Sequence, residues 1–377
     1  MDFAWTEEQD ALYERTLSFA RNALNGHDPD GPFPRDVWNQ LGEMGLLGLS
    51  VPTDYGGLGL DALTTARCVE ALGQGSRDLG IVFSAAAHLF AAVMPIVEHG
   101  SEALKQEILP RVASGEWIAA NAITEAEAGS DVFALRATAR PDGDHIVLDG
   151  AKSYVTNGPV ADVFVVYATS DPGRGFLGIS AFVVPRDTPG LIVGEPFDKL
   201  GLHTSPISSI YCEDCRIPAS YRLGRPGRGA GVFTGSMLWE RACLFAAYVG
   251  AMQRQLDEVV AYAKQRRQGK TPIGKHQAVS HRIVDMKLRL ESARWLLYRA
   301  CWERDQGRQG TLDVALAKLA VSEAAVQSAL DAIQIHGGIG YCEESGVPRA
   351  LRDAVPARIF SGTSEIQRNL AARELGL

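Results

Sequence analysis

The most informative ionisable residue of this sequence is Glu240, which stands inside an apolar helical stretch. It follows Met237 by three positions and precedes Leu244 by four, so on a helix it shares the face of these apolar residues. A carboxylate on that face is desolvated, so its pKa rises and it becomes a better base toward a weakly acidic C–H group. The alternative is a structural ion pair, for example with Arg241, because such pairs also perturb pKa values.

Two further segments combine glycines with small or polar residues. Residues 122–131 could present backbone N–H groups and hydroxyls to a flavin ring or a pyrophosphate, although an ordinary helix-to-strand turn has the same composition. Residues 337–340 read Gly-Gly-Ile-Gly and let the backbone approach a phosphate closely. They follow a helical pattern and not a strand, so they are no Rossmann fingerprint, and a helix C-cap explains them equally well.

The composition excludes several classes of function. The chain has 377 residues, of which 46% are hydrophobic and 22% charged, enough for a large core in two or three domains. The formal net charge of −8 argues against binding to nucleic acid, which needs clustered Lys and Arg. We find no signal-peptide pattern and no uninterrupted run of about eighteen apolar residues, and therefore expect a cytoplasmic protein without a membrane partner.

The cysteines and histidines show no pattern of a metal site or a hydrolase. Cys212 and Cys215 have the C-x-x-C spacing of a zinc or redox site, but no second pair accompanies them and a strand-like run precedes them. The histidines lack the H-E-x-x-H spacing, and no G-x-S-x-G motif occurs. We therefore expect free thiols and no metal.

The period of the apolar residues divides the chain into three parts. Helical spacing dominates the first part, including a buried helix at 81–97, and returns after about residue 231. Between them, strand-like runs predict a β domain, with a hairpin whose tight turn is Asp149-Gly150. The predicted domains are 1–122 (helical), 123–230 (β) and 231–377 (helical bundle), an α+β fold. The predicted strands include 163–168, 179–184 and 210–212, and the later helices cover 277–304, 311–336 and 364–374.

Several motifs, in the expected order, resemble those of the acyl-CoA dehydrogenase family. Residues 359–365 (Ile-Phe-Ser-Gly-Thr-Ser-Glu) are similar to the family's C-terminal signature, in which a glutamate commonly precedes Gly-Thr-Ser and removes a proton from the substrate. Ser361 holds that place here and cannot be that base. Residues 236–244 resemble the segment in which a minority of the family, isovaleryl-CoA dehydrogenase among them, carries the base on another helix. The resemblance thus implies that the base is Glu240.

The same resemblance implies an N-terminal helical domain, a central β domain and a C-terminal four-helix bundle, assembled as a homotetramer with FAD between β domain and bundle. Residues 122–131 resemble the family's segment before the β domain, where the Thr and Ser positions contact the flavin, and residues 152–158 resemble a second flavin-binding segment. Residues 334–338 resemble the place that holds the pyrophosphate of a neighbouring subunit's cofactor. Residues 266–270 resemble the family's Arg-x-Gln-Phe-Gly, but Gly-Lys replaces Phe-Gly, so an aromatic contact is missing. The cofactor-binding residues predicted in this way are Ala122, Thr124, Gly129, Ser130, Tyr154, Thr156, Arg266, Gln334, Gly337, Gly338, Thr363 and Glu365.

In the implied mechanism Glu240 removes the α proton of an acyl thioester while the β hydrogen leaves as hydride to the flavin. The backbone N–H of Ser361 would support the thioester oxygen as enolate character develops. Trp239 and Arg241 are predicted substrate contacts.

Within the family, the pairing of Trp-Glu-Arg at 239–241 with a serine before Gly-Thr-Ser most resembles the flavin-dependent L-prolyl-carrier-protein dehydrogenases of pyrrole-forming pathways. It implies oxidation of an L-prolyl thioester on a phosphopantetheinylated peptidyl carrier protein toward a pyrrole-2-carbonyl thioester. Two alternatives stay open: an acyl-CoA dehydrogenase acting on a short or branched-chain acyl-CoA, and a flavin-free interaction protein of the same fold. The electron acceptor is open between an electron-transfer flavoprotein and oxygen.

Overall fold

The first third of the chain is helical, as predicted, and its first helix begins at a capping box. Thr6 accepts a hydrogen bond from the backbone N–H of Gln9 at 3.2 Å, and the Gln9 side chain accepts one from the backbone N–H of Thr6 at 3.1 Å. The computed structural model describes residues 4–308 and 310–377. The helices of this part are α1 (Glu7–Ala23), α2 (Arg35–Glu43), α3 (Ala62–Gly75), α4 (Leu79–Ala87), α5 (Met94–His99) and α6 (Glu102–Ala113).

A π-helical turn, η2 (His88–Val93), joins α4 to α5, so the predicted buried helix at 81–97 is confirmed. The stretch Leu79–His99 is long and apolar enough to cross a membrane, yet 89% of the relevant window is buried inside the protein, which is the behaviour of a core helix. His88 is accommodated there because Nε2 contacts the carbonyl of Val112 at 3.1 Å and Nδ1 accepts from the N–H of Ala119 at 2.8 Å. Burial lowers the pKa of His88 to about 4.

The middle of the chain folds into an eight-stranded sheet with the order β6-β7-β3-β2-β4-β5-β8, and β1 pairs in parallel with β4. The predicted strands at 163–168, 179–184 and 210–212 are confirmed as parts of β4, β5 and β7. Both faces of β4 are buried, and its residues from 163 to 168 contribute alternately to two separate cores. The strands are β1 (Ala119–Ala122), β2 (Thr138–Asp142), β3 (His145–Thr156), β4 (Val163–Thr169), β5 (Ile179–Pro185), β6 (Leu191–Val193), β7 (Ile207–Pro218) and β8 (Arg222–Leu223).

The predicted hairpin turn at Asp149-Gly150 is wrong. β3 runs straight through these residues, and the turn lies earlier, where Asp142 pairs with His145. Gly150 (φ 140°) instead accompanies a register shift between β3 and β7, and a Cβ there would lie 2.7 Å from Ala137. An Asp-Gly pair supplies the unusual backbone angles of a bulge as readily as those of a turn.

The predicted boundary after residue 122 places β1 with the helices, whereas β1 is part of the sheet.

On β7, Cys212 and Cys215 are both buried, and all six cysteines of the chain are free. Among the described residues no group of three or more His, Cys, Asp or Glu side chains is arranged to hold a metal ion.

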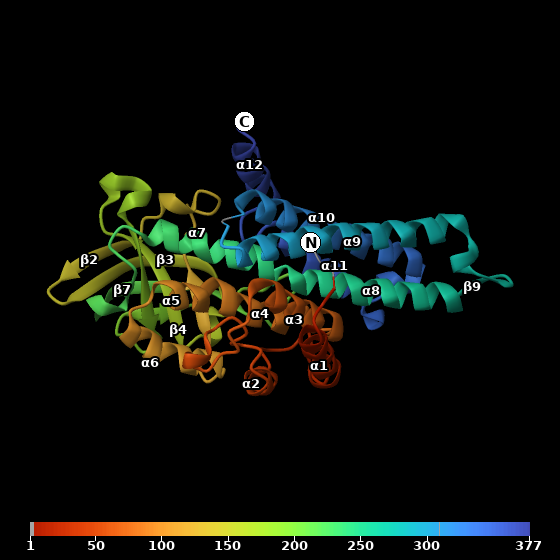
Figure 1. Cartoon of the computed structure of the whole chain (residues 1–377), viewed down its shortest axis with the longest axis horizontal. Helices are drawn as coiled ribbons and strands as arrows, with labels where there is room; N and C mark the ends of the chain where they lie inside the picture. Colours follow the sequence, from red (N-terminus) through yellow and green to blue (C-terminus); the bar gives the residue numbers. More distant parts are fainter. Residues whose placement is uncertain (1–3, 309) are drawn as a thin grey trace.

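The C-terminal part returns to helices, and those predicted at 277–304, 311–336 and 364–374 are confirmed almost to the residue. In Figure 1 the sheet lies at the left, and α8 and α9 run side by side to the right, where the short strand β9 lies. The elements are α7 (Gly229–Trp239), η7 (Glu240–Leu244), α8 (Ala246–Gln265), β9 (Arg267–Gln268), β10 (Thr271–Pro272), α9 (Gln277–Asp305), α10 (Thr311–His336), α11 (Val347–Ala354) and α12 (Ser364–Glu374).

The N-terminal helices are fixed to the bundle by close contact of α3 with α8. Gly73 of α3 lies so near α8 that a Cβ there would be 2.0 Å from the carbonyl oxygen of Ala247, and Gly250 stands equally close to Glu70. Glu70 is also bound by Arg294 of α9 at 2.9 Å. These contacts hold the start of α8, and therefore the turn η7 that precedes it, against the N-terminal helices.

Candidate active site

Glu240 begins η7, a π-helical turn between α7 and α8, and only 7% of the residue is exposed. The prediction that it shares the buried face of the helix is confirmed. Burial raises the pKa of Glu240, and three groups oppose this rise: the hydroxyl of Ser361, the guanidinium of Arg241 and the ammonium of Lys318. The carboxyl group is thus desolvated while its ionised form is supported, as a base for a C–H proton requires.

Ser361 lies against Glu240 in the loop before α12. Its hydroxyl donates a hydrogen bond to Oε1 of Glu240, and its carbonyl accepts from Nε of Arg241 at 2.7 Å and from Nε2 of Gln367 at 3.2 Å. Its φ of 55° is left-handed, a conformation that these contacts hold in place. The sequence pointed only to the backbone N–H of Ser361, so the hydroxyl contact is a finding of the structure.

A second cation near Glu240 was not foreseen. Lys318 of α10 is fully buried, and among the described residues its Nζ has no hydrogen-bond partner. The ammonium lies 5.4 Å from the centre of the Phe245 ring. Burial, followed by repulsion from Arg241, lowers the pKa of Lys318 to about 8. The signal in the sequence was a single lysine in an otherwise apolar turn, Ala-Leu-Ala-Lys-Leu-Ala-Val, at 315–321.

Aromatic side chains form one wall beside these ionisable groups. Phe360, next to Ser361, has its ring centre 4.7 Å from that of Phe83 and 5.3 Å from that of Phe245. Tyr248 extends the cluster at 5.9 Å from Phe245. Because Phe360 directly precedes Ser361, this wall begins next to the residue that contacts Glu240.

The two predicted flavin-binding segments lie next to each other on the sheet. The N–H of Ser153 donates to the carbonyl of Thr124 at 2.8 Å, and a buried ion pair joins Lys152 to Glu125 at 2.7 Å. Tyr154 is 64% exposed, with its ring centre 5.5 Å from that of Phe197. Ala122 ends β1 and is buried, Thr124 and Thr156 are half-buried, and Gly129 and Ser130 are exposed. The accessible residues of this set offer hydroxyls and an aromatic ring to a planar cofactor, whereas Ala122 is buried.

The other predicted cofactor residues are not brought to that surface. Arg266 follows α8 and is exposed. Nearby, the ring of Tyr262 in α8 stacks on the ring of His336 in α10, with 4.2 Å between the ring centres. This contact joins the ends of the two helices. Gln334, Gly337 and Gly338 are exposed at the end of α10, and a Cβ at either glycine would meet no atom within 4 Å. This open backbone is of the kind that admits a phosphate.

Thr363 and Glu365 belong to the start of α12. The hydroxyl of Thr363 accepts from the N–H of Ile366 at 3.3 Å and so caps that helix, whereas Glu365 is exposed. Among the described residues neither side chain forms a hydrogen bond with Glu240 or Ser361, and their assignment to the cofactor stays a prediction.

Comparison with known proteins identifies the family. Models of the N-terminal, middle and C-terminal domains of acyl-CoA dehydrogenases match residues 6–116, 120–215 and 227–376. This chain belongs to the acyl-CoA dehydrogenase family. It is 50% identical to the L-prolyl-[peptidyl-carrier protein] dehydrogenase of Pseudomonas fluorescens over the full length of both chains.

Solved structures of this family agree with the fold. The prolyl acyl carrier protein oxidase AnaB superposes with a TM-score of 0.97 at 42% identity, covering 99% of this chain and 100% of AnaB. PigA, solved with FAD and proline, superposes with a TM-score of 0.97 at 45% identity over the whole of both chains. The predicted architecture of helical domain, β domain and helical bundle is thereby confirmed.

Within the acyl-CoA dehydrogenase fold, the contact between Glu240 and Ser361 bears on the prediction that Glu240 is the base. The hydroxyl of Ser361 touches the carboxylate of Glu240, so this carboxylate lies beside the place that a glutamate at position 361 would occupy. A base carried by η7 therefore reaches the same region of the site as one carried by the loop before α12.

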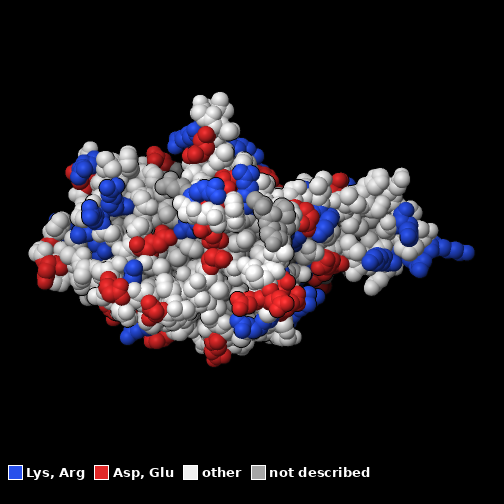
Figure 2. Space-filling view, viewed as in Figure 1, with Lys and Arg blue, Asp and Glu red and all other residues white. Residues whose placement is uncertain are grey.

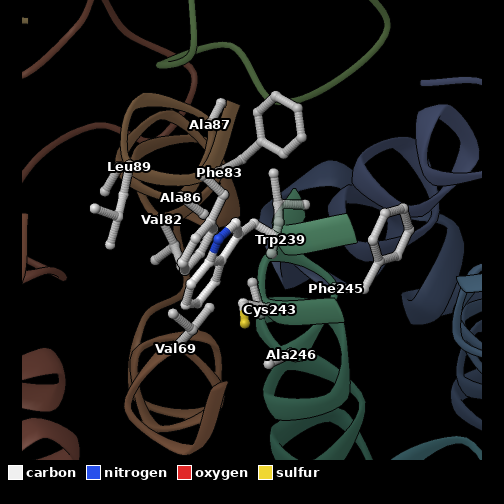
Figure 3. Packing of buried hydrophobic residues seen from close by; sticks show 14 of the residues in the cluster. Val69, Val82, Phe83, Ala86, Ala87, Leu89, Trp239, Cys243, Phe245 and Ala246 are labelled. Carbon is white, nitrogen blue, oxygen red and sulfur yellow. The ribbon is translucent and has the colours of Figure 1, made fainter. Parts of the chain in front are cut away.

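Trp239 precedes Glu240 but is engaged in the core. Its Nε1 donates to Oε1 of Glu98 at 2.6 Å, and the guanidinium of Arg304 lies 3.9 Å from the centre of its ring. Figure 3 shows the indole packed among apolar side chains of α3 and α4. These contacts fix the end of α7, and a contact of Trp239 with substrate stays a prediction.

Proposed function

We propose that this chain is an FAD-dependent dehydrogenase that oxidises an L-prolyl thioester on a peptidyl carrier protein toward the pyrrole-2-carbonyl thioester. The observation that carries the proposal is the buried carboxylate of Glu240 in contact with Ser361, in a chain that is 50% identical to an L-prolyl-[peptidyl-carrier protein] dehydrogenase. The full-length match to PigA, which was solved with FAD and proline, supports both the cofactor and the prolyl group.

The chemistry assigned to this chain begins at the α carbon of the prolyl group. Glu240 accepts the α proton, because burial raises its pKa while Ser361, Arg241 and Lys318 keep its charged form available. The backbone N–H of Ser361 supports the thioester oxygen, and Arg241 fixes the Ser361 peptide through its carbonyl at 2.7 Å.

Bound FAD would supply the acceptor for the β hydrogen, which would leave the substrate as hydride. The surface around Thr124, Ser130, Tyr154 and Thr156 would hold its ring system, since it is accessible and carries hydroxyls and an aromatic ring. Removing two hydrogens twice, with the flavin reoxidised between rounds and aromatisation at the end, converts the pyrrolidine into a pyrrole.

The assembly proposed is a homotetramer. Val284 and Leu288, one turn apart on α9, are 63% and 64% exposed, and a groove of about 560 Å³ lies beside them between α8 and α9. An exposed apolar face of this kind is typical of a subunit interface. A neighbouring subunit would also give Arg266 and Gly337 a cofactor to bind, since within one chain they lie apart from the flavin surface.

We place the enzyme in the cytoplasm, because its six free cysteines are typical of a reducing compartment. The electron acceptor is an electron-transfer flavoprotein or oxygen. Oxygen consumption during turnover distinguishes the two.

The first test is incubation of the purified protein with prolyl-carrier protein, followed by mass spectrometry of the phosphopantetheine arm. A loss of about 4 Da is expected, or about 2 Da if the enzyme stops after one round. The protein should be yellow and release FAD on denaturation. Flavin reduction by a branched-chain acyl-CoA with prolyl-carrier protein left unchanged would favour an acyl-CoA dehydrogenase instead, and a colourless protein that takes up no FAD would favour an interaction protein.

The second test concerns the base. Glu240→Gln keeps the size of the side chain but cannot accept a proton, so it should retain FAD and lose flavin reduction by substrate. Ser361→Ala should be much milder at alkaline pH. A Glu240→Gln variant that still reduces its flavin would show that the base is another group.

A further inference from the structure

An exposed surface at the start of α7 combines apolar and basic side chains. Phe176 and Leu177 of the short helix η5 (Pro172–Gly178) are 56% and 45% exposed. Arg174 in the same helix and Arg225 and Arg228 before α7 are also exposed. Within the described residues, none of these arginines forms an ion pair with a carboxylate. We call these five residues the η5–α7 surface.

The two segments of this surface are in direct contact. Gly227 lies so close to η5 that a Cβ there would be 2.3 Å from the carbonyl oxygen of Leu177, and its N–H donates to the hydroxyl of Ser180 at 3.0 Å. The acid of this loop, Asp171, is engaged with the N–H of Gly173 at 3.1 Å. Figure 2 shows Lys and Arg side chains gathered at this end of the molecule, where Figure 1 places the start of α7.

α7 connects this surface to the candidate base. Glu240 follows directly after the helix, so it lies about 16 Å along the axis from Gly229, at 1.5 Å of rise per residue. Gly231 and Thr234 on one face of α7 are exposed, and a Cβ at Gly231 would meet no atom within 4 Å. The η5–α7 surface and Glu240 therefore lie at opposite ends of the same short helix, a separation that a flexible arm can span.

We propose that the η5–α7 surface is the docking site for the phosphopantetheinylated carrier protein. The three unpaired guanidinium groups suit the anionic phosphodiester of the arm and acidic side chains around it, while Phe176 and Leu177 supply an apolar contact. Three other exposed apolar side chains already have an assignment: Val284 and Leu288 lie on the proposed subunit interface, and Tyr154 on the flavin surface. This inference rests on the proposed function.

The test compares two substrates that differ only in the protein part: prolyl-carrier protein and the prolyl thioester of N-acetylcysteamine. In the triple variant Arg174→Glu, Arg225→Glu, Arg228→Glu, kcat/KM for prolyl-carrier protein should fall roughly tenfold relative to that for the small thioester. The matched control is Arg21→Glu, an exposed arginine at the end of α1. Added salt should raise KM for the carrier with the wild type and have little effect with the triple variant.

A second variant tests the apolar contact. Phe176→Ala should raise KM for prolyl-carrier protein several-fold, whereas Leu200→Ala, at an equally exposed leucine away from this surface, serves as its control. Equal effects of the triple variant on both substrates, or none on either, would overturn the docking site while leaving the proposed function intact. Wild-type enzyme that does not oxidise prolyl-carrier protein would overturn the proposed function itself, and the docking site with it.

Discussion

The hydrogen bond from Ser361 to Glu240 predicts how the reaction depends on pH. Because the hydroxyl donates to the carboxylate, it stabilises the charged form of Glu240 and lowers its pKa against the effect of burial. A hydrogen bond to a charged group contributes about 1.5–3 kcal/mol, and one pKa unit corresponds to about 1.4 kcal/mol. Ser361→Ala should therefore raise the pKa of Glu240 by about 1 to 2 units.

Only ionised Glu240 can accept the proton, so the acidic limb of the rate profile should move to higher pH by the same amount. The assay uses rapid mixing of enzyme and prolyl-carrier protein without oxygen. The rate of flavin reduction is measured at a series of pH values. The plateau rate at alkaline pH should stay close to that of the wild type, because the backbone N–H at position 361 is retained. FAD content, measured in parallel, should be unchanged.

The matched control is Ser364→Ala, three residues further along. Its hydroxyl donates to Glu323 at 2.8 Å and not to Glu240, so the acidic limb should not move. An acidic limb that is unchanged or shifted to lower pH in Ser361→Ala would refute the reasoning, as would an equal shift in both variants.

Three further changes test other parts of the structure. The pKa of His88 is about 4 in the folded state and 6.5 in the unfolded state, so the unfolded state takes up the proton first and the free energy of unfolding should fall by about 3 kcal/mol between pH 6.5 and 4. In His88→Gln the melting temperature should depend less on pH over this range. Gly73→Ala should cost roughly 1–3 kcal/mol or more, since its Cβ would lie 2.0 Å from a carbonyl oxygen of α8, whereas Gly26→Ala meets no atom within 4 Å and should melt like the wild type. Lys318→Met removes a buried cation that supports ionised Glu240, so the acidic limb of the pH–rate profile should move to higher pH while the melting temperature is retained. A fall in melting temperature would contradict this.

Local periodicity was sufficient to predict the regular elements. The helices at 311–336 and 364–374 were placed to the residue, and the burial of Glu240 followed from its spacing to Met237 and Leu244. The apolar run of β4 was also read correctly as a strand. These features depend on contacts within a few residues, or on which face of an element is apolar, and both are written directly in the sequence.

The tertiary structure decided the rest. Asp149-Gly150 is compatible with a turn and with a bulge, and the bulge prevails because β7 pairs along the whole of β3, with the N–H of Asp214 bound to Asp149 at 2.8 Å. Likewise Lys318 on α10 and Ser361 in the loop before α12 come near Glu240 only when these segments pack on η7. In the chain, Ser361 is 121 residues from Glu240. The sequence determined that a carboxylate would be buried, but the groups that set its pKa come from distant segments, and only packing brings them within reach of its charge.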